Sequence, residues 1–101
     1  FSKTTIEMAE TVPLSLDQVP AIDRKYRIQW EEAQECYVLL FPEGLIKLNG
    51  SAGEIMKRVN GTSSIADITA DCEKSFKQPD LEQDVIAFLE IAHERGWIGI
   101  K

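Results

Sequence analysis

The sequence contains only one histidine, His93, and only two cysteines, Cys36 and Cys72, among its 101 residues. A structural or catalytic metal site needs several such ligands at close spacing, or carboxylates clustered around one point. The sequence has neither pattern. His93 lies near the end of a predicted helix, where a cation interacts favourably with the helix dipole. We therefore predict that the chain holds no metal and no cofactor.

The remaining nucleophiles also lack a catalytic setting. Cys36 falls in an apolar strand and Cys72 on the apolar stripe of a helix, and neither setting activates a thiol. Two buried free thiols are expected in a reducing compartment, with one disulfide as the alternative. Ser51 and Ser64 fit helix caps, and no glycine-rich phosphate loop follows a strand. We therefore predict that the chain is not an enzyme.

Basic residues are also scarce, with 11 Lys and Arg against 17 Asp and Glu, a net charge of −6 and a pI of about 4.7. Binding to nucleic acid or to an anionic membrane requires clustered cations. No apolar run approaches the roughly 18–20 residues of a membrane-spanning helix, and no secretory signal is visible. We predict a cytoplasmic protein whose partners are neither nucleic acids nor membranes.

The first part of the chain, residues 1–20, has scattered apolar residues without a clear period, and Pro13 and Pro20 interrupt any helix. We predict a flexible N-terminal tail or linker over residues 1–20, followed by one domain over residues 21–101. The apolar residues of the tail are expected to form a loose strap over the core. An arm that contacts a partner is the alternative.

Alternation and apolar runs predict three strands, over residues 26–30, 36–41 and 45–48, with a tight turn at Pro42-Glu43-Gly44. Helical spacing then predicts three helices. Their expected N-terminal signals are the capping pairs Ser51/Glu54 and Ser64/Asp67, and Asp80. Residues 97–100 are expected to form a strand or a strap. The predicted fold is therefore α+β, a three-stranded antiparallel sheet followed by three helices, similar to a winged helix-turn-helix.

Winged helices often bind DNA, so a DNA-binding transcriptional regulator is the alternative function. The third helix, however, has Arg95 as its only arginine or lysine. Its other charged side chains are acidic: Asp80, Glu82, Asp84, Glu90 and Glu94. Laying this helix along phosphates would be repulsive. Electrostatics therefore disfavours the DNA-binding alternative.

Peptide capture fits the predicted elements better. The short third strand follows a turn, so we expect it at a sheet edge, where an extended peptide can add as a further strand. A third helix beside that edge would complete a groove. Alternation places Leu45 and Lys47 on one face and Ile46 and Leu48 on the other, so core packing alone is the alternative for one of the two pairs. Core packing is an equal alternative for Val85 and Leu89.

Several segments together resemble the PqqD family of pyrroloquinoline quinone biosynthesis. They are Tyr26–Glu31, Ala33-Gln34, Leu39–Gly44, Lys47–Asn49, Ala52, Glu54–Met56 and Gly96–Ile98. The resemblance covers roughly residues 20–100, and the most specific part is the run around Pro42-Glu43-Gly44. Phe41 stands where the family pattern has tyrosine, which is a conservative change.

The resemblance implies a non-catalytic peptide chaperone. Family members bind the precursor peptide PqqA and present it to the radical S-adenosylmethionine enzyme PqqE, which crosslinks a Glu and a Tyr of the peptide. The same fold serves as a leader-recognition element in other peptide-modifying systems. Some members are fused to the oxidase PqqC, which would suit a chain without an initiator Met. An exposed edge strand and an apolar tail would also allow a homodimer.

The peptide groove of the family lies between the third strand and the third helix. The resemblance carries it over onto Leu45, Ile46, Lys47 and Leu48, and onto Val85, Phe88, Leu89 and Ala92. Lys47 and Arg95 are expected to pair with acidic side chains of the peptide.

Overall fold

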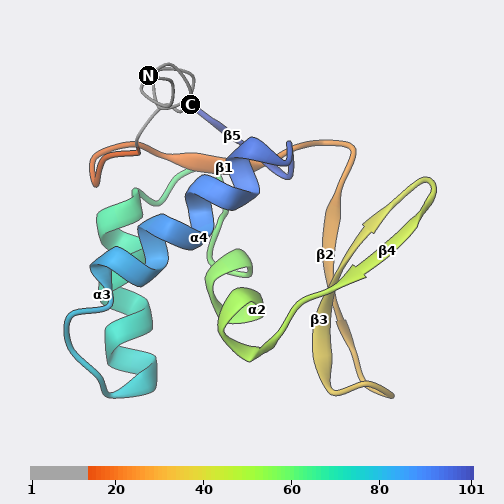
Figure 1. Cartoon of the computed structure of the whole chain (residues 1–101), viewed down its shortest axis with the longest axis horizontal. Helices are drawn as coiled ribbons and strands as arrows, with labels where there is room; N and C mark the ends of the chain where they lie inside the picture. Colours follow the sequence, from red (N-terminus) through yellow and green to blue (C-terminus); the bar gives the residue numbers. More distant parts are fainter. Residues whose placement is uncertain (1–13) are drawn as a thin grey trace, which may run out of the picture.

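The computed structural model describes residues 14–101, which form an α+β fold (Figure 1). The chain first forms four strands: β1 (Pro20–Ile22), β2 (Arg27–Glu31), β3 (Cys36–Phe41) and β4 (Gly44–Lys47). Three helices and a last strand follow: α2 (Gly50–Met56), α3 (Ile65–Phe76), α4 (Glu82–Glu94) and β5 (Ile98–Ile100).

The main sheet has three antiparallel strands in the order β2-β3-β4. β3 is its central strand. Leu39 of β3 lies opposite Ile28 of β2 on one side and opposite Ile46 of β4 on the other. The two-residue connection Pro42-Glu43 joins β3 to β4, and Phe41 lies opposite Gly44. The predicted three-stranded antiparallel sheet followed by three helices is confirmed.

A second, two-stranded sheet joins the two ends of the domain. β1 runs antiparallel to β5, with Pro20 opposite Ile100. The last residues of the domain therefore form a strand, one of the two predicted alternatives.

The start of α3 binds the segment that precedes β1. The N–H groups of Ile65 and Ala66 donate to the carbonyls of Gln18 and Leu16, each at 2.9 Å.

The segment before β1 is part of the packed structure. Leu14 is only 6% exposed, and its N–H donates to Glu90 Oε2 at 3.2 Å. Residues 14–20 of the predicted tail are thus a fixed strap over the core, because their main chain binds α4 and the start of α3. The rest of that predicted tail, residues 1–13, lies outside the described residues.

The first helices begin with side-chain caps. Asn49 is the N-cap of α2, and its Oδ1 accepts from the N–H of Ala52 at 2.8 Å. The predicted cap at Ser51 is therefore wrong, because the helix already starts at Gly50. The predicted capping box of α3 is confirmed, since Ser64 and Asp67 bind each other's backbone N–H.

The start of α4 also differs from the prediction. Asp80 does not cap the helix, because it adopts a left-handed conformation with φ of 61°. Leu81 occupies the cap position without a side-chain cap, and its N–H donates to Glu73 Oε2 at 3.1 Å. A carboxylate of α3 therefore binds the N–H of the cap residue itself, and no side chain caps the first turn of α4.

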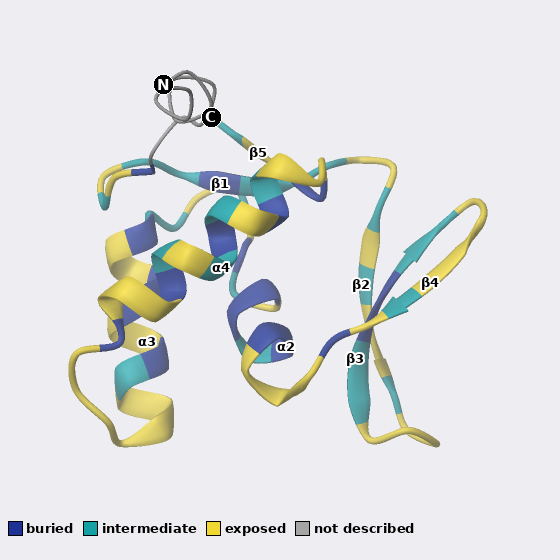
Figure 2. Ribbon diagram, in the orientation of Figure 1, coloured by how far each residue is buried: buried dark blue, intermediate teal, exposed yellow. Residues whose placement is uncertain are grey.

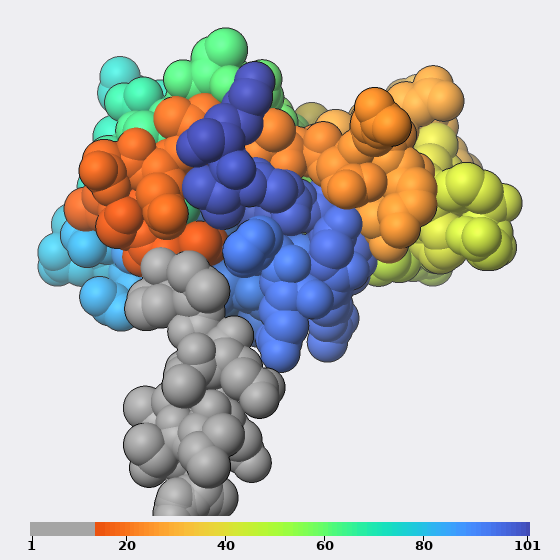
Figure 3. Space-filling model, turned by 90° about the horizontal axis from the view of Figure 1, so that it is seen from above, coloured from red at the N-terminus to blue at the C-terminus, as the bar shows by residue number. Residues whose placement is uncertain are grey.

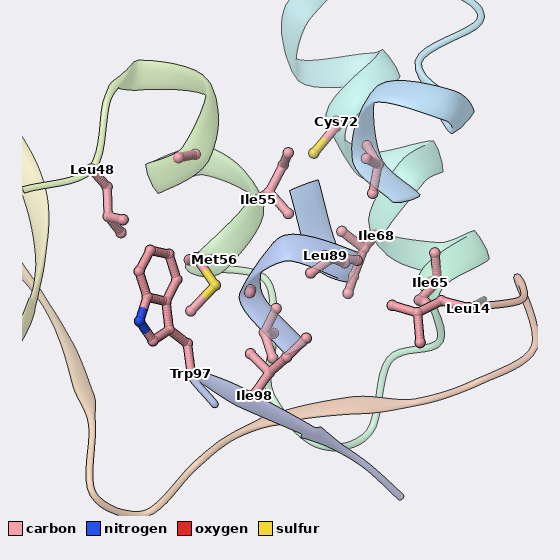
Figure 4. Close-up of a cluster of buried hydrophobic side chains, with 14 of the residues drawn as sticks. Leu14, Leu48, Ile55, Met56, Ile65, Ile68, Cys72, Leu89, Trp97 and Ile98 are labelled. Carbon is pink, nitrogen blue, oxygen red and sulfur yellow. The ribbon is translucent and has the colours of Figure 1, made fainter. Parts of the chain in front are cut away.

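The core lies among the inner faces of the three helices, β3 and β5 (Figure 2). Figure 4 shows Met56, Leu89 and Trp97 within one cluster of buried side chains. α2 contacts β3, and so joins the sheet to the helices. Cys36 and Cys72 are free thiols, half-buried and buried respectively.

Candidate functional site

The free edge of β4 is the first element of the candidate site. In an antiparallel pair, residues whose main chain points to the partner strand alternate with residues whose main chain points away. The N–H of Leu48 donates to the carbonyl of Tyr37 at 3.0 Å, so the main chain of Leu48 points to β3. By alternation the main chain of Ile46 also points to β3, whereas the main chain of Leu45 and Lys47 points outward. No strand within residues 14–101 pairs with this outer edge.

The side chains of β4 divide in the same way. Leu45, which is 50% exposed, and Lys47 project from the outer face, whereas Ile46 packs against the core and Leu48 is buried. Ile46 and Leu48 therefore serve the core, as one pair was expected to do. A ligand strand on β4 would meet the main chain of Leu45 and Lys47 and the side chain of Leu45.

The predicted site residues on α4 fall into two groups. Val85, Leu89 and Ala92 have at most 1% of their surface exposed, so their side chains belong to the core. Phe88 is half-buried, and Arg95 is exposed with its guanidinium carbon 5.5 Å from the centre of the Trp97 ring. Only the second group is accessible to a ligand.

Sequence reasoning missed Ile91, which is 45% exposed on α4. It follows Phe88 by three residues, so the two side chains lie on neighbouring parts of one helix surface. The sequence signal for its exposure was the position of this isoleucine outside the apolar stripe of the helix.

The segments that follow β4 and α4 meet in the core. Leu48 follows β4 directly, and Trp97 lies in the short segment between α4 and β5. Both belong to the buried cluster and lie near each other in Figure 4. Along the rest of its length α4 packs mainly against α3 and β5, and α2 lies between α4 and β3 in the view of Figure 1. The groove expected between β4 and α4 therefore stays a prediction.

A cavity of about 440 Å³ lies among the three helices. Its lining is largely apolar and includes Ile55, Phe76, Leu81 and Val85. Cys72 also lines it, and burial raises the pKa of this thiol. Because a protonated thiol is a poor nucleophile, the cavity offers no activated cysteine.

The described residues carry few perturbed titratable groups. The hydrogen bond from Arg58 holds the pKa of Glu54 below its ordinary value, and Lys57 adds to the effect. Within residues 14–101, no three His, Cys, Asp or Glu side chains are grouped to hold a metal ion. No helix in this part of the chain is long and apolar enough to cross a membrane.

Curated proteins from several bacteria are similar to this chain over most of its length. The "PqqA binding protein" of Pseudomonas aeruginosa (strain UCBPP-PA14) is 49% identical over 88 residues, which cover 86% of this chain and 96% of that protein. The protein of the same name from Azotobacter vinelandii is 49% identical over 92 residues, or 90% and 97% of the two chains. The one from Acinetobacter baylyi is 42% identical over 100 residues, or 96% and 95%.

A solved structure supports the fold. The solution structure of the PqqD truncation of Methylobacterium extorquens PqqCD, described as a stand-alone recognition element for ribosomally synthesized and post-translationally modified peptides, superposes with a TM-score of 0.72. It is 24% identical, and the match covers 88% of this chain and 96% of that one. The sequence pattern of the family described as "Coenzyme PQQ synthesis protein D (PqqD)" matches residues 36–98. With this match and the relatives at 49% identity, the chain belongs to the PqqD family.

Proposed function

We propose that this chain is a peptide chaperone that binds the precursor peptide PqqA along the outer edge of β4 and presents it to the radical S-adenosylmethionine enzyme PqqE. The curated relatives are named for binding PqqA. The matched solution structure is described as a peptide recognition element. These descriptions support PqqA as the ligand, and the free edge of β4 supports strand addition as the mode of binding.

The observation that carries the proposal is the outward-facing main chain of Leu45 and Lys47 at a free sheet edge. Each residue offers one N–H and one C=O at the spacing that an added strand requires. Main-chain bonds of this kind give affinity without fixing the peptide sequence. Specificity must then come from the side chains next to the edge.

The side chains proposed for the site suit a peptide with apolar and acidic residues. Leu45 is an exposed apolar contact on the sheet, and Phe88 and Ile91 are apolar contacts on α4. Lys47 and Arg95 are exposed cations that would pair with carboxylates of the peptide, although each exposed pair contributes only about 0–1 kcal/mol. Val85, Leu89 and Ala92 act indirectly, because they hold α4 in place from within the core.

The acidic surface of α4 argues against the DNA-binding alternative. Its first turn carries Glu82 and Asp84, and Glu90 and Glu94 follow. A recognition helix in the major groove would have to place these carboxylates near phosphates. We therefore keep peptide binding as the single proposal.

An amide-shift titration of the labelled chain with a synthetic PqqA peptide tests the proposal. We expect saturable shifts confined to residues 44–49 and 84–95, with the largest changes at the outward-facing amides of Leu45 and Lys47. Amides of Gly44 and Ile46 face β3 and serve as an internal comparison, since they should shift less. No shift at near-millimolar peptide, or shifts centred on β2, would contradict strand addition at β4.

A further inference from the structure

Cations are concentrated in the connection between β1 and β2 and at the first residue of β2. Arg24, Lys25 and Arg27 lie within four residues of a chain that has only 11 Lys and Arg and a net charge of −6. All three side chains are exposed. Within residues 14–101 the ion pairs join Glu54 to Lys57 and Arg58, and none uses these three cations.

The turn that carries these cations is held in place by main-chain bonds. The N–H of Asp23 donates to the carbonyl of Trp97 at 2.9 Å, which ties the turn to the segment between α4 and β5. Within the turn, the N–H of Lys25 donates to Asp23 Oδ1 at 2.9 Å and the N–H of Tyr26 donates to Asp23 O at 2.8 Å. The cations therefore project from a preorganised turn, which lowers the entropy cost of binding.

A cavity of about 430 Å³ opens beside the turn. It is lined by cations, aromatic rings and small apolar surfaces: Arg24, Lys25, Tyr26, Arg27, Leu40, Phe41 and Pro42. The rings of Tyr26 and Phe41 pack against each other with their centres 5.5 Å apart. Figure 3 shows this orange segment on the outside of the molecule, between the blue C-terminal part and the yellow-green hairpin. The cavity thus combines positive charge with apolar surface.

Strand pairing fixes the position of the cavity relative to β4. Arg27 lies opposite Leu40, and Leu40 lies opposite Leu45, so the three residues form one row across the sheet. At about 4.8 Å between strands, Arg27 lies roughly 10 Å from Leu45 and about 15 Å from a peptide strand added to β4. A partner seated in the cavity would therefore lie close to the bound peptide and leave the edge of β4 free.

We propose that this basic cavity, lined by Arg24, Lys25 and Arg27, docks an acidic segment of the enzyme that modifies the peptide. The inference rests on the proposed function, because it assigns the second partner to a second surface. An acidic segment complements the three cations, and an apolar side chain within it would cover Tyr26 and Phe41. The remaining surface of this acidic chain would repel such a segment, so charge also orients the encounter.

The test compares two variants with the same change in charge. Arg24→Glu with Lys25→Glu reverses two cations of the cavity, and Lys74→Glu with Lys101→Glu reverses two exposed cations outside its lining. Affinities for purified PqqE, with and without PqqA, are measured at several salt concentrations. PqqA binding is measured separately for each variant by the amide shifts described above, which also verify folding.

We expect the cavity variant to lose about tenfold or more of its affinity for PqqE, with a weaker dependence on salt. Its PqqA affinity should stay within about twofold of wild type, and the control variant should resemble wild type in both assays. Equal PqqE affinity for the two variants, or a wild-type chain that does not bind PqqE, would overturn the docking surface. So would a loss of PqqA binding alone, since the cavity would then hold the peptide. If wild type fails to bind PqqA but only the cavity variant loses PqqE, the proposed function fails and the docking surface stands.

Discussion

Gly53 of α2 lies so close to Tyr37 of β3 that a methyl group on Gly53 would lie 3.0 Å from Tyr37 Cδ2 and 3.1 Å from Tyr37 Cβ. Gly53 is buried, and Tyr37 also packs edge-on against Trp30 with ring centres 5.0 Å apart. The missing side chain at Gly53 therefore lets α2 approach the sheet. Through this contact the helices are connected to β3, the strand that pairs with β4.

The first prediction is that Gly53→Ala destabilises the fold by about 1 kcal/mol. Alanine is the better helix former by about 1 kcal/mol, but overpacking typically costs about 1–3 kcal/mol. Tyr37 Cβ cannot move away by rotation of the side chain, so we expect the steric cost to exceed the gain. Urea unfolding of both proteins measures the difference.

Gly50→Ala is the matched control. Gly50 opens the same helix, and a methyl group there would meet nothing within 4 Å. We expect this change to be neutral or slightly stabilising. A Gly53→Ala protein as stable as the Gly50→Ala protein would show that α2 can shift on the sheet at no cost.

The three strands of the main sheet were well predicted because each depends on local signals. β1 was not predicted, because its three residues pair only with β5 at the other end of the domain. The apolar run of residues 36–41 has the same bounds as β3 in the structure. The turn at Pro42 and Gly44 fixes where the next strand must begin. The edge position of β4 also followed from its short length and its place after that turn. Membership of the PqqD family, whose curated relatives are named for binding PqqA, confirms the resemblance and the prediction that the chain is not an enzyme.

Helix starts were harder to predict because nearby residues compete to cap them. Ser51 and Glu54 match a capping box, but Asn49 captures the N–H of Ala52 instead. Leu48 is buried directly after β4, so the chain must turn into the helix at once. For α4, the bond from Leu81 to Glu73 links residues eight positions apart through a folded loop, which no local pattern reveals.

The candidate site was only partly visible in the sequence. Apolar spacing identified the stripe with Val85, Leu89 and Ala92, but the same spacing is typical of a core-facing helix, and these residues are buried. Which apolar side chains remain exposed depends on how α4 packs against α3 and β5. The exposure of Ile91 is therefore a tertiary property of the fold.

The second prediction concerns the outward-facing main chain of β4. Lys47→Pro removes an N–H that points away from β3, so the sheet should remain intact. If the peptide pairs with this edge, the loss of one main-chain bond should weaken PqqA binding by about 0.5–1.5 kcal/mol. Lys47→Ala is the control, because it removes the lysine charge and keeps the N–H. Isothermal titration with PqqA compares the affinities of the two variants. Equal affinities would contradict pairing at Lys47.

The third prediction separates the buried and exposed sides of α4. Leu89→Ala should lower the free energy of unfolding by about 2–5 kcal/mol, because Leu89 is fully buried. Ile91→Ala should change stability by less than about 0.5 kcal/mol, because Ile91 is 45% exposed. We expect Ile91→Ala nevertheless to weaken PqqA binding, as measured by titration of the folded variant. Unchanged affinity in that variant would remove this part of α4 from the peptide site.

The fourth prediction concerns the ion pair within α2 and the turn that follows it. Arg58 Nη1 donates to Glu54 Oε1 at 2.9 Å and to the carbonyl of Glu54 at 2.7 Å, and the Glu54 side chain is 27% exposed. The hydrogen bond from Arg58 lowers the pKa of Glu54 below its ordinary value of 4.5. A carboxylate with a lowered pKa in the folded state stabilises the fold above its unfolded pKa, and this contribution is lost as the pH falls through the folded pKa.

Glu54→Gln removes this titration and keeps the shape of the side chain. Near pH 7 the variant should be less stable than wild type by up to about 1 kcal/mol, the range of a partly exposed pair. As the pH falls below the ordinary pKa of 4.5 the gap should narrow, because Glu54 in the wild-type protein takes up its proton there, at a pKa lowered by Arg58. Urea unfolding of both proteins across this pH range measures the difference in their free energies of unfolding. The other carboxylates titrate in both proteins, so their contributions cancel in this difference. A gap that stays constant with pH would mean that Glu54 contributes through packing, and that its charge adds nothing to the stability of α2.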